Sequence, residues 1–410
     1  MKASGIIPAD YRAREGELLV GGRGIGSVLD QAGGSPLFVY DMEIVRQRVA
    51  RFRQAIPSEV SLHYAIKANP YFDLLKSIGS VVDGFDVASQ GEMALALEAG
   101  MAADHISIAG PGKRDVELAA AIEAGVTINL ESEREAERAL SIAAGQDQRP
   151  RLAVRVNPDF EIKGSGMRMG GGAKPFGVDA VRVPVLVRRL IAAGADWRGF
   201  HIFAGSQALD AEAIIAAQRA TMVLAAELAD QAGATPPLVN LGGGFGIPYF
   251  PGEQPLDVEA IGAALAGIVA DRAPILASTA FAIELGRWLV GEAGVYLTRI
   301  VDRKVSHGEV FLVVDGGLHH QLAASGNFGT VVRRNYPVAV ANRFGAEAEE
   351  VVSVVGCLCT PLDRLADKVA LPKADVGDVI AIFMAGAYGM TASPSAFLGH
   401  PKPYEIMVGV

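Results

Sequence analysis

Residues 62–111 read LHYAIKANPYFDLLKSIGSVVDGFDVASQGEMALALEAGMAADHISIAGP. Within this stretch, short runs of β-branched and aromatic residues alternate with longer segments of helical character. The segment QGEMALALEAG ends in Gly100, and glycine is common at the C-terminus of a helix. The stretch therefore predicts strand–helix units that repeat along the chain.

The same alternation continues to about residue 290 and yields eight expected strands. They are LHYAIKAN, GFDVAS, HISIAGP, VTINLES, RLAVRVNP, GFHIFAGSQ, LVNLGGGFG and FAIELGRWLV. Strands and helices in this alternation predict an α/β fold, a (β/α)8 barrel of the TIM type. An open, doubly wound sheet is the competing layout, but its motif G-x-G-x-x-G is missing after the first strand.

The pattern of apolar and polar residues changes after about residue 290. Valine-rich runs with a period of two, such as VFLVVDGG and VVSVVGCLCT, predict an antiparallel β domain. The early runs ELLVGG and PLFVYD show the same strand-like pattern, and we expect them to join the C-terminal sheet. The expected divisions are N-terminal strands over 1–40, a barrel over 41–288 and a β domain over 289–410.

The composition is that of a globular protein with an excess of acidic side chains. The 410 residues carry a net charge of −9, and the arginines are scattered, which argues against a nucleic-acid partner. The first residues lack the apolar core of a signal peptide, and no apolar run approaches membrane-spanning length. We therefore expect a cytoplasmic protein with no membrane partner. The two cysteines, Cys357 and Cys359, are only two residues apart, and we expect them to form no structural disulfide.

Polar residues, glycines and one phenylalanine mark the carboxyl ends of the expected barrel strands, where such barrels carry their chemistry. These residues are Lys67, Asp86, Arg155, Phe203, Ser206, Gly242, Gly243, Gly244, Glu284, Gly286 and Arg287. Taken singly, Lys67 has a plain interpretation, since a lysine at a strand end often reaches water. As a set, the residues suit an aldehyde cofactor with a phosphate and a pyridine ring: a lysine forms the Schiff base, glycine amides bind the phosphate and a carboxylate faces the ring nitrogen.

Seven motifs point to a known family. In chain order they are YAIKANP, GFDVASQGE, HIFAGSQ, GGGFG, ELGRWLV, GCLCTPLD and GAYGMTAS. With them the chain resembles, over nearly its whole length, the fold-type III pyridoxal-phosphate decarboxylases, which include diaminopimelate, ornithine and arginine decarboxylases. The resemblance implies pyridoxal 5'-phosphate (PLP) as the cofactor, no metal, and a homodimer with shared active sites.

The resemblance also implies a role for each matching residue. Lys67 would hold PLP as a Schiff base, Glu284 would keep the ring nitrogen protonated, and Cys359 would donate a proton from the partner subunit. The other implied cofactor contacts are Ser206, Gly242, Gly243, Gly244 and Gly286 at the phosphate, Asp86 and Arg155 beneath the ring, Phe203 on its face, Tyr388 against the cofactor, and Arg287 near the phosphate or the substrate. Cys357 is expected to be a packing residue, and the role of His201 stays open.

Three positions depart from the pattern of the family. Phe203 replaces a ring-stacking histidine, and Leu285 replaces a proline. Thr360 replaces the acidic residue that grips the distal ammonium of a basic amino acid, although Asp363 matches an aspartate of the family and is not far away. HIFAGSQ, LHHQLAASGNFG and CLCTPLD look most like carrier-protein-linked glutamate decarboxylases and exosortase-associated enzymes. That subgroup implies an amino acid without a distal charge, tethered to an acyl-carrier protein.

Other functions compete with this interpretation. The nearest is diaminopimelate decarboxylase, which has the same reaction and a different substrate. An amino-acid racemase would place an arginine opposite the pyridine nitrogen, where this chain has Glu284. A non-catalytic PLP carrier has no need of both Lys67 and Cys359.

Overall fold

The computed structural model describes residues 1–162, 164, 166–168, 170–326 and 333–410. The chain divides into two compact units. The barrel unit comprises Val49–Ile247 and Pro255–Gly286, and the β unit comprises Met1–Arg48, Pro248–Gln254 and Arg287–Val410. Residues 248–254, which lie inside the barrel sequence, are therefore grouped with the β unit.

The barrel unit contains a closed ring of parallel strands that follow one another in chain order. The eight strands of the ring are β5 (Val60–Ala65), β6 (Gly84–Val87), β7 (Ile106–Ile108), β8 (Thr127–Leu130), β9 (Arg151–Asn157), β12 (Asp196–Ile202), β14 (Leu238–Gly243) and β15 (Ala280–Leu285). Pairing of β15 with β5 closes the ring. The predicted TIM-type barrel and its eight strands are confirmed.

The strands of the ring are buried along most of their length, because helices cover them outside and side chains fill them inside. Gly199 shows how closely neighbouring strands approach. Its φ is +104°, and a Cβ atom there would lie 1.9 Å from the carbonyl oxygen of Leu238 on β14. A side chain at this position would therefore push β12 away from β14.

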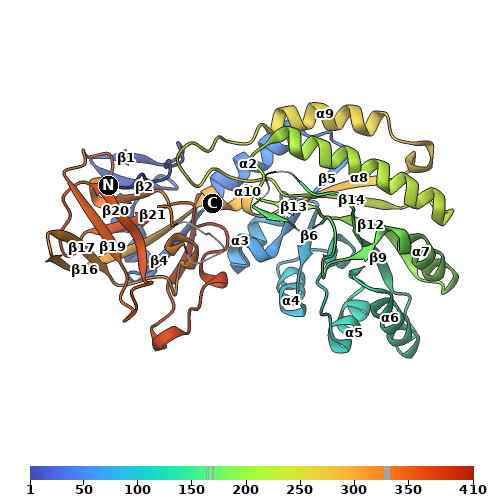
Figure 1. Ribbon diagram of the computed structural model, residues 1–410. Coiled ribbons are helices and arrows are strands. Elements are labelled where there is room, and N and C mark those ends of the chain that lie inside the picture. The colour runs from blue at the N-terminus through green and yellow to red at the C-terminus, as the bar shows by residue number, and fades with distance from the viewer. Residues whose placement is uncertain (163, 165, 169, 327–332) are drawn as a thin grey trace. The chain divides into compact units, whose positions relative to one another are not determined.

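A helix follows each of the ring strands from β5 to β14 and leads to the next one, as the blue-to-yellow succession in Figure 1 shows. The helices are α2 (Met42–Ala55) before the ring, then α3 (Phe72–Ile78), α4 (Gln90–Glu98), α5 (Asp115–Ala124), α6 (Glu133–Gly145), α7 (Val183–Ala192), α8 (Ala211–Ala232) and α9 (Val258–Ala270). Ser89 and Ser132 cap the N-termini of α4 and α6 through their side chains, and Gly125 ends α5 in a left-handed conformation. Within the described part of the chain, no helix has the length and apolarity needed to cross a bilayer.

Among the described residues of the barrel unit, three short strands lie at the carboxyl ends of the ring. They are β10 (Met167–Arg168), β11 (Val178–Asp179) and β13 (Gly205–Ser206). β11 adds to β9 in parallel, and β10 pairs with β13.

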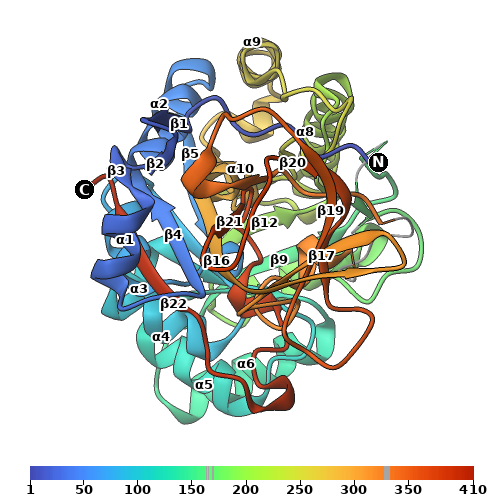
Figure 2. The same cartoon turned by 90° about the vertical axis from the view of Figure 1, so that its left-hand side faces the viewer.

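The described residues of the β unit form one larger and one smaller sheet. The larger sheet consists of β4 (Leu37–Asp41), β16 (Gly294–Ser306), β17 (Glu309–Val314), β18 (Val338–Val340), β19 (Glu350–Val355), β20 (Arg364–Leu371), β21 (Val379–Ile382) and β22 (Tyr404–Val408). The smaller sheet consists of β1 (Arg12–Arg14), β2 (Glu17–Val20) and β3 (Arg23–Gly24), and the unit also contains α1 (Ile25–Ala32) and α10 (Arg287–Val290). In Figure 2, β4 in blue can be followed beside β22 in red.

Two details of the β unit differ from the expectation. PLFVYD forms β4 and joins the C-terminal sheet as predicted, but ELLVGG forms β2 and pairs only within the small sheet. The large sheet is mixed and not wholly antiparallel, because β17 pairs with β19 in parallel and β4 with β22 in parallel. Such pairs need long connections, and the period-two pattern of a strand carries no information on the direction of its neighbour.

Candidate active site

Lys67 lies immediately after the first strand of the barrel. It occupies a single 3-10 turn, Ile66–Ala68, in which both neighbours are buried while Lys67 itself is exposed. Its Nζ lies 5.8 Å from the centroid of the Phe203 ring, which follows β12. The predicted Schiff-base lysine and the aromatic ring predicted to cover the cofactor therefore lie near each other at the carboxyl end of the barrel.

Glu284 is buried on β15 and has two side-chain partners. His201 Nε2 lies 3.1 Å from its Oε2, and Asn240 Nδ2 donates to the same oxygen at 3.3 Å. Burial would raise the pKa of Glu284, but His201, Lys67 and Arg155 outweigh it and hold the pKa well below its usual value. Because the carboxylate is ionised and can only accept, His201 Nε2 is the donor in this pair.

His63 and Asp86 form a second polar pair, on the neighbouring strands β5 and β6. His63 Nδ1 lies 3.8 Å from Asp86 Oδ2, and Ser107 donates a hydrogen bond to Asp86 Oδ1. Burial would lower the pKa of His63, but Asp86, with Glu284 and Asp83, outweighs burial and raises it. Asp86 therefore lies inside the barrel in a polar setting, as its position at a strand end suggested.

Arg155 belongs to a buried group of charges at the ends of β8 and β9. Its Nη1 donates to Glu131 Oε1 at 2.8 Å, and the amides of Gly177 and Gly110 also donate to Glu131. Burial would raise the pKa of Glu131, but these partners lower it. Arg155 also stacks on the ring of Phe176, at 5.2 Å from its centroid. The guanidinium is thus held rigidly within the described part of the barrel.

The glycine run Gly242–Gly244, at the end of β14, forms a closely packed turn of the backbone, here called the glycine cradle. Gly242 and Gly244 have φ of +71° and +80°, and a Cβ on Gly243 would lie 1.8 Å from the carbonyl oxygen of Glu284. A Cβ on Gly244 would lie 2.4 Å from the carbonyl oxygen of Gly205. Side chains are therefore excluded from these positions, and the chain runs here as bare glycine backbone.

The residues present fit the cofactor that the resemblance implies. The Oγ of Ser206, next to the cradle, is buried and has no hydrogen-bond partner in the described part of the chain, and the same holds for Asp86 Oδ2 and His201 Nδ1. Orphaned polar atoms beside bare glycine backbone suit a phosphate-bearing ligand with polar ring substituents. Gly286 is equally constrained, since a Cβ there would lie 2.8 Å from the Cβ of Ala68.

Arg287 and Tyr388 contact each other within the β unit. The guanidinium of Arg287 lies 4.7 Å from the ring centroid of Tyr388 and 5.4 Å from that of Tyr249, and it donates to the Tyr249 hydroxyl at 2.7 Å. Two aromatic rings therefore fix the orientation of this cation.

The loop after β19 carries Cys359, which is exposed, and Thr360, which is half-buried. Asp363 closes this loop and is only 3% exposed. Its Oδ1 accepts from the amide of Leu318 at 2.6 Å, and its Oδ2 accepts from the amide of Leu358 at 2.8 Å. Asp363 therefore ties two loops together through backbone amides.

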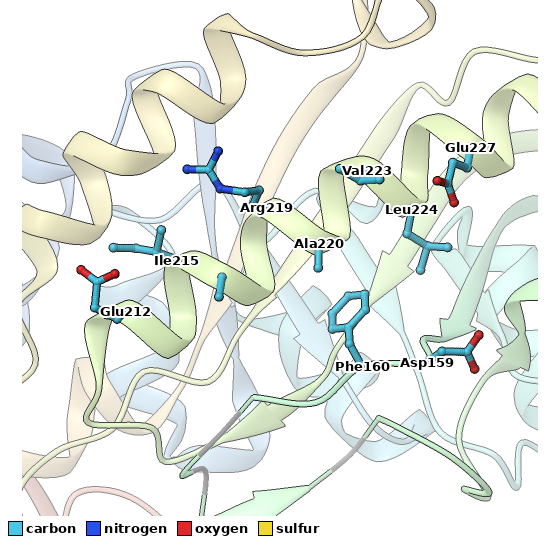
Figure 3. Close-up of a pocket in the computed structure, with 10 residues that line it drawn as sticks. Asp159, Phe160, Glu212, Ile215, Arg219, Ala220, Val223, Leu224 and Glu227 are labelled. Atoms are coloured by element: carbon cyan, nitrogen blue, oxygen red, sulfur yellow. The ribbon is translucent and has the colours of Figure 1, made fainter.

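One groove of the barrel unit contains none of the predicted residues. It is a groove of about 650 Å³ along α8, where Figure 3 shows Phe160 beneath the helix and Glu212, Arg219 and Glu227 along it. No predicted cofactor or substrate residue lines this groove, so we assign it no part in the chemistry.

The structure adds residues that the motifs did not single out. Asn240 and Glu131 contact Glu284 and Arg155, and His201, whose role was open, contacts Glu284. Asn240 and His201 could have been found as polar residues inside apolar strands, in VNL and FHI. Residues 327–329 of the LHHQLAASGNFG motif lie outside the described residues.

Comparisons with known proteins agree with this arrangement. Residues 42–291 match the pyridoxal binding domain of the pyridoxal-dependent decarboxylases. The L-glutamyl-[BtrI acyl-carrier protein] decarboxylase of Niallia circulans is 35% identical, over 91% of this chain and 88% of the relative. The diaminopimelate decarboxylase of Methanothermobacter thermautotrophicus is 32% identical, over 96% and 91%. The structure of Helicobacter pylori diaminopimelate decarboxylase, complexed with L-lysine, has a TM-score of 0.82 at 26% identity and covers 93% of this chain and 94% of its own.

Proposed function

The chain belongs to the pyridoxal-dependent decarboxylases, and from this premise we propose that it removes the carboxyl group of an amino acid whose distal end carries no charge. The proposed substrate is held as a thioester on an acyl-carrier protein. The reaction class and the use of PLP follow from the family, whereas the substrate rests on one loop of the β unit.

Within the barrel, residue roles follow from chemistry. When bound, PLP supplies an electron sink for the charge left on carbon as carbon dioxide departs. Lys67 would bind the aldehyde of the cofactor, and the glycine cradle with Ser206 would bind its phosphate. Glu284, which accepts hydrogen bonds from His201 and Asn240, would hold a proton on the ring nitrogen.

Lys67 suits its role because its amine is a potential nucleophile and the Phe203 ring lies beside it. The flat face of Phe203 would support the ring of the cofactor and exclude water from it. Arg155 and Asp86 would provide fixed charges below, since each is held by partners of its own.

The substrate assignment rests on the charge and the hydrogen bonds of Thr360 and Asp363, the two candidate substrate residues after Cys359. Thr360 has a hydroxyl and no charge, and its Oγ1 accepts from the amide of Leu362 at 3.3 Å. Asp363, the nearby carboxylate, is buried and its two oxygens are used by backbone amides. A distal ammonium would find no free carboxylate on this loop, and a buried ammonium without such a partner is costly.

The relatives support the same assignment in part. One acts, by its name, on a glutamyl group of an acyl-carrier protein, and others are diaminopimelate decarboxylases of only slightly lower identity. Diaminopimelate is therefore the second candidate substrate, and the test must separate the two.

We also propose that the enzyme works as a homodimer in which Cys359 of one subunit serves the Lys67 site of the other. Cys359 lies in the β unit, whereas Lys67 and Glu284 lie in the barrel unit. The exposed side chain of Cys359 is in keeping with a role at a surface that a second copy covers.

The deciding measurement is the ratio of kcat/KM for an L-glutamyl thioester of carrier protein to kcat/KM for meso-diaminopimelate. The ratio should favour the thioester, and Thr360→Glu should lower it by introducing a charge that a neutral thioester cannot pair. Thr360→Val is the matched control, since it removes the hydroxyl without adding charge. A parent ratio that favours diaminopimelate would overturn the substrate proposal and leave the decarboxylase intact.

A further inference from the structure

Three potential metal ligands meet in the β unit, apart from the residues proposed to bind the cofactor. His319, Cys357 and His400 each offer one ligand atom, and these atoms all lie within 4.8 Å of one another. We propose that these three side chains bind a divalent transition-metal ion with the coordination chemistry of zinc. Cys357, expected from the sequence to be a packing residue, would be a ligand.

The topology of the sheet explains why two of the ligands are neighbours. β17 and β19 pair in parallel, with Val313 opposite Val355, so both strands deliver their following loops to the same edge. His319 is in the first loop and Cys357 in the second, and the amide of Cys357 donates to the carbonyl of Gly316. The two ligands therefore come from adjacent strand ends.

Neighbouring hydrogen bonds fix the loops that carry the ligands. Asp363 binds the amides of Leu318 and Leu358, each next in sequence to a ligand. His320 lies 3.0 Å from the hydroxyl of Tyr296 and 3.0 Å from the carbonyl of Pro401, which follows His400. Each ligand therefore has a sequence neighbour whose backbone is anchored by a hydrogen bond. Such hydrogen bonds around a metal site help to orient the ligands.

His319 provides an independent reason to expect a ligand here. It is fully buried at 0% exposure, and neither ring nitrogen has a hydrogen-bond partner in the described part of the chain. A buried polar group without a partner is rare and unfavourable. An ion bound to one ring nitrogen would remove part of that cost.

The identity and spacing of the ligands select the kind of ion. Two imidazoles and a thiolate favour zinc or a similar transition metal over calcium or magnesium, which prefer oxygen. Zinc binds sulfur at about 2.3 Å and nitrogen at about 2.0 Å, which in a tetrahedral site places such atoms roughly 3.5 Å apart. The Sγ of Cys357 lies 3.8 Å from Nδ1 of His400, so small side-chain movements would close the site. With three protein ligands, a fourth coordination position stays open to water or another molecule.

An ion at this site would brace the loop that also carries Cys359 and Thr360. Cys357 is two residues before Cys359, in a loop already closed by Asp363. The metal proposal itself stands apart from the proposed substrate, because metal binding is measured without turnover.

The experiment uses the full-length holoenzyme after treatment with a chelator. Titration with Co²⁺ alone should reach saturation at equimolar metal and produce a thiolate-to-cobalt charge-transfer absorption band. Cys357→Ser should abolish the band, and His319→Ala or His400→Ala should weaken binding by at least about tenfold, as expected for a lost contact in a metal site. Cys359→Ser is the matched cysteine control and should keep the band, as should His307→Ala in an exposed turn.

Circular dichroism shows whether each variant is folded, and His400→Ala, at a half-buried residue, serves as the second variant if His319→Ala unfolds. Failure of the folded parent to bind Co²⁺ or Zn²⁺ at micromolar concentration would overturn the proposal. So would an unchanged band in folded Cys357→Ser, or loss of the band in Cys359→Ser but not in Cys357→Ser.

Discussion

The buried carboxylate of Glu284 accepts a hydrogen bond from Nε2 of His201 across 3.1 Å. Glu284 lies on β15 and His201 on β12; β14 lies between these strands, and its Asn240 is in register with His201 and donates to Glu284. This neighbourhood keeps the pKa of Glu284 well below its usual value despite burial. The lowered pKa favours an ionised carboxylate at the carboxyl end of β15, where the cofactor is proposed to bind.

Removing that charge should slow the reaction strongly. Glu284→Gln keeps the shape of the side chain but cannot hold a proton on the ring nitrogen, so kcat for carbon dioxide release should fall by roughly 10²–10³-fold, the scale of losing one main electrostatic stabiliser. Glu212→Gln, at an exposed residue of α8, should leave kcat unchanged. Turnover near that of the parent in Glu284→Gln would remove Glu284 from the proposed catalytic residues.

Lys67 should be the residue that binds the cofactor covalently. Borohydride reduction of the holoenzyme, followed by peptide mass spectrometry, should find the PLP adduct on Lys67, and Lys67→Ala should lack it. Lys76→Ala is a suitable control, because Lys76 is an exposed lysine in the last turn of α3. An adduct on any other lysine of the parent would contradict the assignment.

Mixing two inactive variants should restore activity if the sites are shared between subunits. In a hybrid dimer of Lys67→Ala and Cys359→Ala, one of the two sites would contain both native residues. Random exchange should therefore recover about a quarter of the parent's sites, as expected for a symmetric dimer. Subunit exchange is verified with differently tagged chains, and exchange without recovered activity would argue that each subunit builds its own site.

His63 should make the stability of the protein depend on pH. Its pKa is raised above the ordinary value because Asp86 and other carboxylates outweigh burial, so the folded state favours the protonated form. This stabilisation is fully present below the ordinary pKa of about 6.5 and is lost as pH rises through the raised pKa. The melting temperature of the parent should exceed that of His63→Gln most at acid pH, and the gap should narrow as pH rises. His307→Asn in an exposed turn is the control, and a gap that widens with rising pH would contradict the prediction.

The barrel and most of its site residues could be predicted because their sequence signals are local. Each barrel strand is a short apolar run, and Lys67, the glycine run and Glu284 come at the ends of such runs. The partners of Glu284 could not be predicted, because His201 and Asn240 reach it only through the register of three strands far apart in sequence. A polar residue within an apolar strand indicates that it has a buried partner, but the strand sequence alone does not identify that partner.

The two early segments PLFVYD and ELLVGG have different patterns of apolar residues, and these patterns match the different burial of β4 and β2. All five residues of β4 are buried, in keeping with its continuous apolar run LFVY and a place inside the large sheet. β2 alternates between partly exposed and buried residues, as a strand with one covered face does. Both segments are rich in strand-forming residues, and the prediction used only this property. It therefore wrongly placed ELLVGG in the C-terminal sheet.

The pairing of β4 has a consequence for the order in which the chain is made. On the ribosome, β4 emerges long before either neighbour, since β16 begins at Gly294 and β22 at Tyr404. Until then its backbone N–H and C=O groups have neither partner strand, and an apolar strand with open edges is prone to pair with other chains. Translation that stops before residue 404 would leave one edge of β4 permanently uncovered, so incomplete chains should be recognised by chaperones and proteases through one of the first strands to be made.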